Sequence, residues 1–330
     1  MTVLVTGATG FVGSAVARKL LDRGQSVRVM ARANSDRSNL EGLDVEVAVG
    51  DLTDNASLIA ACKGCDGLYH VAADYRLWTL DPASMLATNV EGSRNMALAA
   101  AEAGIGRMVY CSSVAVLGID PVPPHGTEDT PVTYANMIGP YKQSKYLAEE
   151  AVRGLIDKGG LEVVIVNPST PIGPRDIKPT PTGRVIVEAA SGRMPAYVDT
   201  GLNIAHVDDV AEGHLLAMEK GVSGERYILG GENMTLYEIL IDVAGIVGGK
   251  PPKVCIPHNA ILPFAALAEG WARLTRGKEP FATLDGIKMA KKKMFFSCEK
   301  AKRELGYTPR PAHEALADAV EWFRDKGYLR

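Results

Sequence analysis

The chain has 330 residues, of which 46% are hydrophobic and 23% charged, and this composition excludes a disordered chain and a single small module. Lysine and arginine (36) nearly balance aspartate and glutamate (39), so the net charge of −3 gives no overall field that would attract nucleic acid or an anionic membrane. At about 150 residues per domain, the length predicts two domains or one large domain with an added lobe.

The cysteines and the apolar runs predict a location. Five cysteines form an odd set, and no secretory leader precedes the strand-like run at Thr2, so we expect the reducing cytoplasm. The longest candidate for membrane insertion, Ala260 to Ala268, is about nine residues long and contains Pro263, whereas a span needs about twenty. We expect no transmembrane segment, and contact with a membrane surface stays open.

The first residues predict a strand, a tight turn and a helix. The apolar run Thr2 to Thr6 is followed by a turn with three glycines and then by a helical pattern. Gly7 would permit the bend, Gly10 would let the backbone approach a pyrophosphate, and Gly13 would allow the helix to pack closely on the strand. A plain turn is the alternative. The expected cofactor contacts here are Gly7, Thr9, Gly10, Phe11, Val12 and Gly13.

The residue after the second strand, Ser26 to Met30, selects the cofactor. An acidic side chain there would bind the ribose hydroxyls of NAD, and a basic one would accommodate the extra phosphate of NADP. This chain has Arg32 at that place, with Ser35 and Arg37 close behind. Because guanidinium pairs bidentately with phosphate, we predict NADP, with NAD as the alternative.

Apolar strands and helices continue to alternate, with strands at Val45 to Val49, Gly67 to Val71 and Arg107 to Cys111 and a helix from about Met85 to Ala103. This alternation predicts an α/β fold, a Rossmann-type doubly wound parallel sheet with a smaller C-terminal substrate lobe. We expect a dinucleotide-binding domain over 1–166 and a lobe over 167–330, some of whose segments return to the sheet. The strand ends would place on one rim Asp51, Leu52, Ala72, Ala73, Ser112 and Ser113.

Tyr141 is the only tyrosine with a lysine four residues later, Lys145. On a helix over Tyr141 to Val152 the two side chains share a face, and the ammonium would favour the phenolate. Tyr141 would then exchange a proton with a substrate oxygen nearer neutral pH than its usual pKa of about 10 allows. Ser113, just past a strand, would hydrogen-bond the same oxygen. Hydride transfer between C–OH and a nicotinamide needs this arrangement.

These motifs resemble the extended short-chain dehydrogenase/reductase superfamily, over essentially the whole chain. The glycines match its cofactor turn, Asp51 and Leu52 its adenine edge, and Ser113, Tyr141 and Lys145 its catalytic trio. The resemblance further implies a catalytic role for Asn89 and a place near the nicotinamide for Pro168 and Thr170. Ser112 remains the alternative to Ser113.

Several segments, including Tyr110 to Gly118 and Asn167 to Pro174, are most similar in sequence to hopanoid-associated sugar epimerases and dihydroflavonol-reductase-like proteins. Three functions follow from this resemblance. The first is an NADP-preferring reductase or dehydrogenase of a small molecule, and the second is a nucleotide-sugar epimerase or dehydratase that retains NAD. The third is a non-catalytic cofactor-sensing protein.

The second half is rich in proline and predicts a substrate lobe, in which Arg184, Tyr197 and Asn203 would face the cleft by analogy with the superfamily. His206, Asp208 and Asp209 are adjacent, but we read an aspartate there as a helix cap and expect no metal. Likewise we interpret Cys62 and Cys65 as ordinary loop cysteines.

Lys291 to Lys293 form the only basic block. This block could meet an anionic lipid surface, and the apolar segment Ala260 to Trp271 could gate a greasy substrate. We favour a solvated face for the lysines and lobe core for the apolar segment. No pattern supports nucleic acid as a partner, and a homodimer is possible.

Overall fold

The computed structural model describes residues 1–123, 125–156, 160–277, 279–280 and 282–329. Its centre is a seven-stranded parallel sheet in the order β10-β6-β5-β4-β1-β2-β3, which confirms the predicted Rossmann-type fold. The strands are β1 (Thr2–Thr6), β2 (Ser26–Ala31), β3 (Glu46–Val49), β4 (Gly67–His70), β5 (Arg107–Cys111), β6 (Glu162–Pro168) and β10 (Arg226–Leu229).

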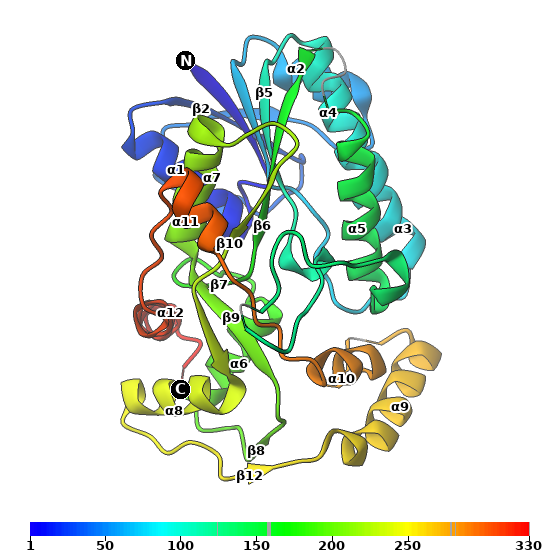
Figure 1. The fold of residues 1–330 in the computed structure, drawn as a ribbon, viewed down its shortest axis with the longest axis vertical. Coiled ribbons are helices and arrows are strands. Elements are labelled where there is room, and N and C mark those ends of the chain that lie inside the picture. Colours follow the sequence, from blue (N-terminus) through cyan, green and yellow to red (C-terminus); the bar gives the residue numbers. More distant parts are fainter. Residues whose placement is uncertain (124, 157–159, 278, 281, 330) are drawn as a thin grey trace.

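Helices cover both faces of this sheet, as Figure 1 shows. One face carries α1 (Phe11–Asp22), α7 (Val207–Lys220) and α11 (Glu299–Leu305), and the other carries α2 (Asn55–Cys62), α4 (Gly92–Glu102) and α5 (Gly139–Arg153). Each face therefore buries an apolar core of its own, which fixes the orientation of the strands between them.

The lobe is built around a three-stranded sheet in the order β11-β9-β7. Its strands are β7 (Thr170–Ile172), β9 (Gly201–His206) and β11 (Glu232–Thr235), covered by α6 (Pro181–Ala190), α8 (Leu236–Val247) and α12 (Ala312–Asp325). A short pair, β8 (Ala196–Tyr197) and β12 (Val254–Cys255), leads to α9 (His258–Thr275) and α10 (Leu284–Ala290). In Figure 1 the parallel strands run from the N-terminus toward this lobe, so their carboxyl ends face it.

The first strand and the fifth match their predicted ranges, and the predicted helix Met85 to Ala103 is present as a helical run from Pro82 to Glu102. The structure divides it into α3 (Pro82–Leu86), the wider π-helical turn η2 (Ala87–Glu91) and α4. Turns of this kind are frequent at functional sites, and η2 carries Asn89.

Segments from the second half of the chain complete the first half. β10 forms an edge of the main sheet beside β6, and α7 packs along α1. The division at residues 166 and 167 stays a prediction. Within the described ranges, none of the helices combines the length and hydropathy that a bilayer crossing requires.

Candidate active site

The turn after β1 has the shape of a phosphate cradle. Gly7 has a φ of 71°, and a Cβ there would lie 2.7 Å from the Ala72 backbone nitrogen. A Cβ on Gly13 would lie 2.2 Å from the Gly7 carbonyl oxygen, so only glycine lets α1 start this close to β1. The sequence assigned these roles to Gly7 and Gly13, and the geometry agrees with them.

The first turn of α1 is left open to an anion. Its N-cap, Gly10, has no side chain to cap the helix, and no acidic residue lies in the first turn. The backbone N–H groups of Phe11, Val12 and Gly13 therefore present a positive end toward the cradle. A dinucleotide pyrophosphate fits this cradle, which would hold it by backbone groups alone.

A buried network fixes the β1 and β4 ends of the rim. Thr6 Oγ1 accepts from the backbone nitrogens of Val71 and Ala72 at 3.1 and 3.2 Å and lies 2.7 Å from His70 Nδ1. The hydroxyl hydrogen thus points to Nδ1, and His70 Nε2 carries the ring proton toward Ser93 Oγ at 3.2 Å. Burial lowers the pKa of His70 to about 3, so this histidine is a neutral structural link.

The adenine edge of the rim follows β2 and β3. Arg32 is exposed just past β2, and the pKa of Asp51 is lowered mainly by hydrogen bonds from Thr53 and to a smaller extent by the Arg32 charge. Hydrogen bonds from Thr53 hold the Asp51 carboxylate, and Leu52 is buried against Gly92. Ala72 and Ala73 are half-buried after β4, while Pro168 ends β6 and Thr170 begins β7.

Tyr141 and Lys145 lie on one face of α5, one turn apart. Lys145 is buried, and its ammonium donates to the Cys111 carbonyl at 2.8 Å and lies 5.1 Å above the Tyr110 ring centroid. The end of β5 therefore fixes this ammonium beside the phenol of Tyr141.

Ser113 is the serine that reaches Tyr141. Its hydroxyl interacts with the Tyr141 phenol and accepts from the Ala115 backbone nitrogen at 3.1 Å. The Ser112 hydroxyl is buried and has no hydrogen-bond partner among the described residues. Asn167 Nδ2 donates to the Ser113 carbonyl at 3.0 Å and to the Glu149 carboxylate at 3.2 Å, which anchors the Ser113 backbone.

The pKa of Tyr141 corrects one expectation. The Lys145 charge lowers it, as the sequence predicted, and the Ser113 interaction lowers it further. Burial acts in the opposite direction and is the largest cause, so the net pKa of Tyr141 lies above its usual value of 10.0. The phenol is therefore protonated at neutral pH and is ready to donate a proton.

Asn89 connects the β4 loop to the catalytic helix. Its Oδ1 accepts from the Asp74 backbone nitrogen at 2.7 Å, and its Nδ2 donates to the Asp74 carbonyl at 2.9 Å and to Ser144 Oγ at 2.9 Å. Among the described residues, the side-chain hydrogen bonds of Asn89 go to Asp74 and Ser144 and not to Tyr141 or Lys145, so it acts as a positioning residue for α5.

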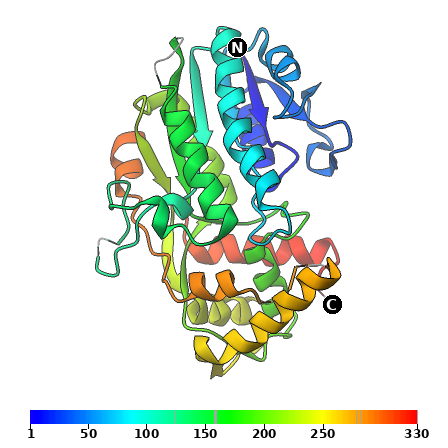
Figure 2. The same ribbon diagram turned by 90° about the vertical axis from the view of Figure 1, so that its right-hand side faces the viewer.

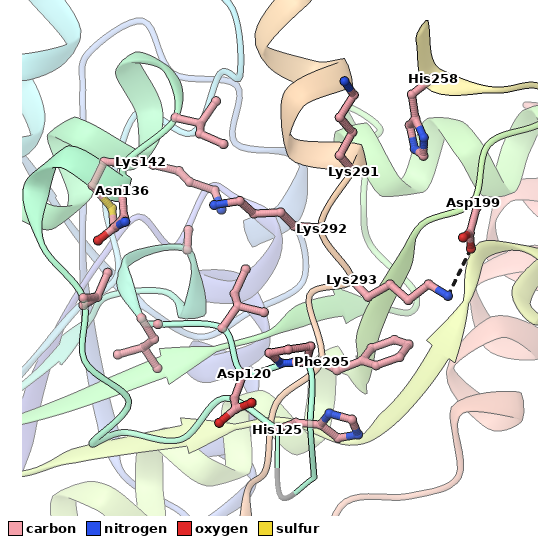
Figure 3. A pocket seen from close by; sticks show the side chains of 18 of the residues that line it. Asp120, His125, Asn136, Lys142, Asp199, His258, Lys291, Lys292, Lys293 and Phe295 are labelled. Atoms are coloured by element: carbon pink, nitrogen blue, oxygen red, sulfur yellow. Dashed lines mark ion pairs between the residues drawn. The ribbon is translucent and has the colours of Figure 1, made fainter.

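A cavity of about 890 Å³ opens next to the segments that carry this group, although Ser113, Tyr141 and Lys145 do not themselves line it. It is lined by Ala115, two residues after Ser113, and by Lys142, the neighbour of Tyr141. Residues from the lobe close its other side, among them Lys292 and Phe295 (Figure 3). Its volume suits a small organic molecule.

The three substrate-lobe candidates lie outside this cavity. Arg184 is exposed on α6 and pairs with Glu279 at 3.1 Å, and Tyr197 stacks on Tyr237 with ring centroids 4.9 Å apart. Asn203 is buried, with its amide bonded to Gly231, Asn233 and Phe296. The prediction that these residues face the substrate rested on analogy and stays a prediction, and only Asn203 has its side-chain amide fully engaged within the lobe.

The basic block Lys291 to Lys293 is not only a solvated face. Lys291, Lys292 and Lys293 are exposed, as expected, but they also line the cavity. The segment Ala260 to Trp271 is wrong as lobe core, because α9 points Phe264, Leu267 and Trp271 outward with 73%, 74% and 68% exposed.

The remaining clusters are structural. His206, rather than an aspartate, caps α7, accepting from the Asp208 backbone nitrogen at 3.0 Å, while Asp209 pairs with Arg310 at 2.9 Å. No group of three or more possible metal ligands gathers within the described parts of the chain. Cys62 ends α2 in the core, so it is not a loop cysteine, and burial raises its pKa to about 12, which makes the thiol inert.

A family model described as the NAD dependent epimerase/dehydratase family matches residues 3–230. The chain belongs to this family. Together with its relatives, this match confirms the predicted resemblance to extended short-chain dehydrogenases/reductases. The chain is thus an enzyme of this NAD(P)-dependent class.

The relatives of this chain include both reductases and epimerases. A dihydroflavonol 4-reductase-like protein of Synechocystis sp. is 45% identical over 99% of this chain and 95% of its own. Sterol demethylase protein B of Methylococcus capsulatus is 36% identical over the full length of both. The crystal structure of gox2253 is 56% identical, with a TM-score of 0.89, over 100% of this chain and 99% of that one. A nucleoside-diphosphate-sugar epimerase from Pseudomonas aeruginosa is 28% identical, with a TM-score of 0.79, over 100% and 99%.

Proposed function

We propose that the protein is an NADP(H)-preferring oxidoreductase that transfers hydride between a nicotinamide and a C–OH or C=O carbon of a small molecule. The observation that carries this proposal is the buried phenol of Tyr141 with the Lys145 ammonium and the Ser113 hydroxyl close to it, on the helix that also lines the cavity. A proton donor, an oxygen clamp and space for a substrate thus occur together at the carboxyl ends of the strands.

The residues divide the chemistry among them. A bound nicotinamide dinucleotide supplies or accepts the hydride. In the direction of reduction, Tyr141 donates its proton to the carbonyl oxygen, and the carbonyl becomes an alcohol. Ser113 donates a hydrogen bond to that oxygen and fixes its position. Lys145 stabilises the phenolate left on Tyr141 until solvent returns a proton, and the reverse direction uses the same groups.

The test of this proposal is Tyr141→Phe. Loss of the hydroxyl removes the proton donor, so reduction of a panel of aldehydes and ketones should fall by roughly 10²–10⁴-fold. Tyr237→Phe, on the stacked pair in the lobe, is the matched control and should retain its activity. Cofactor affinity, measured by fluorescence titration, should change little. Full activity in Tyr141→Phe would disprove the mechanism.

The NADP preference is supported by Arg32, which is exposed just beyond β2 where a carboxylate would select NAD. The nearest acidic side chain along the chain, Asp36, is bound by Ser38 and lies 3.7 Å from Lys178. Arg32→Asp should therefore weaken NADP roughly tenfold and leave NAD nearly unchanged. Equal affinities of the starting protein for both cofactors would contradict the preference.

A nucleotide-sugar epimerase or dehydratase that retains NAD is the second candidate. The family match and the relative from Pseudomonas aeruginosa favour it, and it would use the same catalytic residues. Mass spectrometry of the cofactor released from purified protein separates the two. Tightly retained NAD without net reduction of any carbonyl would replace the first proposal with this one. A non-catalytic cofactor sensor would lack both activities.

The exposed face of α9 supports a peripheral contact with membranes. Phe264, Leu267, Trp271 and Leu274 recur with helical spacing and are between 68% and 79% exposed. Figure 2 shows α9 on the outside of the lobe. Sedimentation with anionic vesicles checks this contact, and Trp271→Ser with Leu274→Ser should abolish it. A second copy of the chain could cover the same face, and light scattering would then report a homodimer.

The place of the enzyme in the cell is also a proposal. Five free cysteines, four of them buried, support a reducing cytoplasm. The resemblance to hopanoid-associated proteins and the relative called sterol demethylase protein B support a role in hopanoid metabolism. Deletion of the gene followed by lipid extraction would test this role through the accumulated precursor.

A further inference from the structure

One positive charge in the cavity has no counter-charge among the described residues. Lys142 follows Tyr141 on α5 and is only 8% exposed. Among the described residues, its ammonium makes a single polar contact, with the Met294 thioether sulfur at 3.5 Å. A thioether is a weak acceptor, whereas a buried ammonium normally has a carboxylate or several oxygens around it. The fold therefore holds a charge that its own residues do not neutralise.

A second ammonium faces the first. Figure 3 shows Lys142 and Lys292 pointing toward one another from opposite walls of the cavity, one from α5 and one from the segment after α10. Burial, and to a smaller extent the charge of Lys292, lowers the pKa of Lys142 to about 8. Like charges brought together in this way are unfavourable unless an anion lies between them.

The charged side chains that line the cavity carry more positive than negative charge. Lys293 is paired with Asp199 at 3.1 Å, and Lys291 donates to the side chain of Asn259 at 2.9 Å. Four lysines and two aspartates line the described cavity, which leaves two positive charges on its lysines and aspartates. An anionic group of one or two charges would balance this surplus.

We propose that the cavity binds an oxyanion carried by the substrate, a phosphate or a carboxylate, between Lys142 and Lys292. Describing this oxyanion as part of the substrate rests on the proposed function, because Lys142 is the chain neighbour of Tyr141. The remaining wall is largely apolar and includes Leu117, Ile119 and Phe295. The substrate class is thus an amphiphilic acid whose apolar body lies along this wall while its charged end pairs with the two lysines.

Binding can be measured without any turnover. The protein is first saturated with NADP, so that the glycine turn cannot take up the phosphate probe. Hexyl phosphate, hexanoate and neutral 1-hexanol are then titrated by calorimetry. At least one acid should bind roughly tenfold or more tightly than the alcohol, because a charged hydrogen bond is lost with the neutral probe. The tighter acid identifies phosphate or carboxylate as the source of the oxyanion.

Two variants locate the oxyanion at the lysines. Lys292 is exposed, so we expect the Lys292→Ser variant to fold normally. Its affinity for the acid should decrease roughly tenfold. Lys142→Met keeps the apolar length and should weaken it further. Lys63→Ser, an exposed lysine after α2, is the matched control and should change the affinity less than twofold.

The outcomes separate this proposal from the proposed function. Equal binding of the three probes, or affinities unchanged in both cavity variants, would overturn the oxyanion site. Lysine-dependent binding would support the site even in a protein that reduces no carbonyl, in which case the reductase proposal alone fails. Carbonyl reduction with no lysine-dependent binding would leave the reductase and remove the oxyanion site.

Discussion

Two buried lysines on α5, three residues apart, meet opposite environments. Lys145 donates to the Cys111 carbonyl and lies above the Tyr110 ring, whereas Lys142 contacts only the Met294 sulfur among the described residues. The first ammonium is held by the fold and serves Tyr141. The second ammonium is buried without a counter-charge. This lowers the stability of the fold but leaves the ammonium available to a ligand. The same helix thus carries one charge that the fold positions and one charge that needs a ligand.

The largest expected effect tests the positioned charge. Lys145→Met removes the charge that lowers the pKa of Tyr141, so the phenolate becomes harder to form. Turnover at pH 7 should fall by roughly a hundredfold or more, and the alkaline rise of alcohol oxidation should move to higher pH. Steady-state kinetics across pH measures both. An unshifted profile would mean that Lys145 does not act through Tyr141.

The next effect is on stability and tests the uncompensated charge. The pKa of Lys142 falls from 10.5 unfolded to about 8 folded, which corresponds to a penalty of about 3 kcal/mol when both states are protonated. This penalty is complete below pH 8. It declines as pH rises from 8 to 10.5, because the folded state loses a proton that the unfolded state keeps.

Lys142→Met should therefore be more stable than the starting protein at pH 7, and the difference should disappear above about pH 10.5. Urea unfolding at a series of pH values measures it. Lys63→Met controls for the general effect of removing a lysine, because Lys63 is exposed. A Lys142→Met variant that is less stable at pH 7 would mean that a partner compensates this charge.

The smallest effect concerns the facing lysine. Lys292→Ser removes a repulsive charge that contributes less to the Lys142 shift than burial does. The pKa of Lys142 should rise by a fraction of a unit, and NMR titration of its labelled side chain would detect this. A decrease would show that the two ammoniums do not face one another in solution.

Local patterns were enough to predict the Rossmann-type fold of the first half and to suggest the trio. Strands β1 and β5 follow from short apolar runs, and Tyr141 with Lys145 follows from helical spacing, because both signals lie within one element. The glycine turn was predictable for the same reason. Only the balance between burial and charge at Tyr141 could not be predicted, since burial depends on the whole molecule.

The cavity could not be predicted in this way. Lys142 meets Met294, a residue 152 positions away, and no local pattern records such a contact. Lys291 to Lys293 formed a visible basic block, yet the sequence could not show that the chain folds them back against α5. Asn203 shows the opposite case. Analogy predicted that it faces the substrate, but its amide is hydrogen-bonded to residues of the lobe.

The position of β10 has a consequence for biosynthesis. This strand lies at the edge of the sheet beside β6, although some sixty residues separate the two in the chain (Arg226 pairs with Ile165). A ribosome must therefore deliver the chain beyond Leu229 before the edge of β6 is covered, and α7 must be present before the outer face of α1 is buried. Until then Val163, Val164 and Ile165, paired with β5 on one side, present an open apolar edge on the other, and such an edge is prone to aggregate. We expect a fragment ending at residue 166 to need a chaperone.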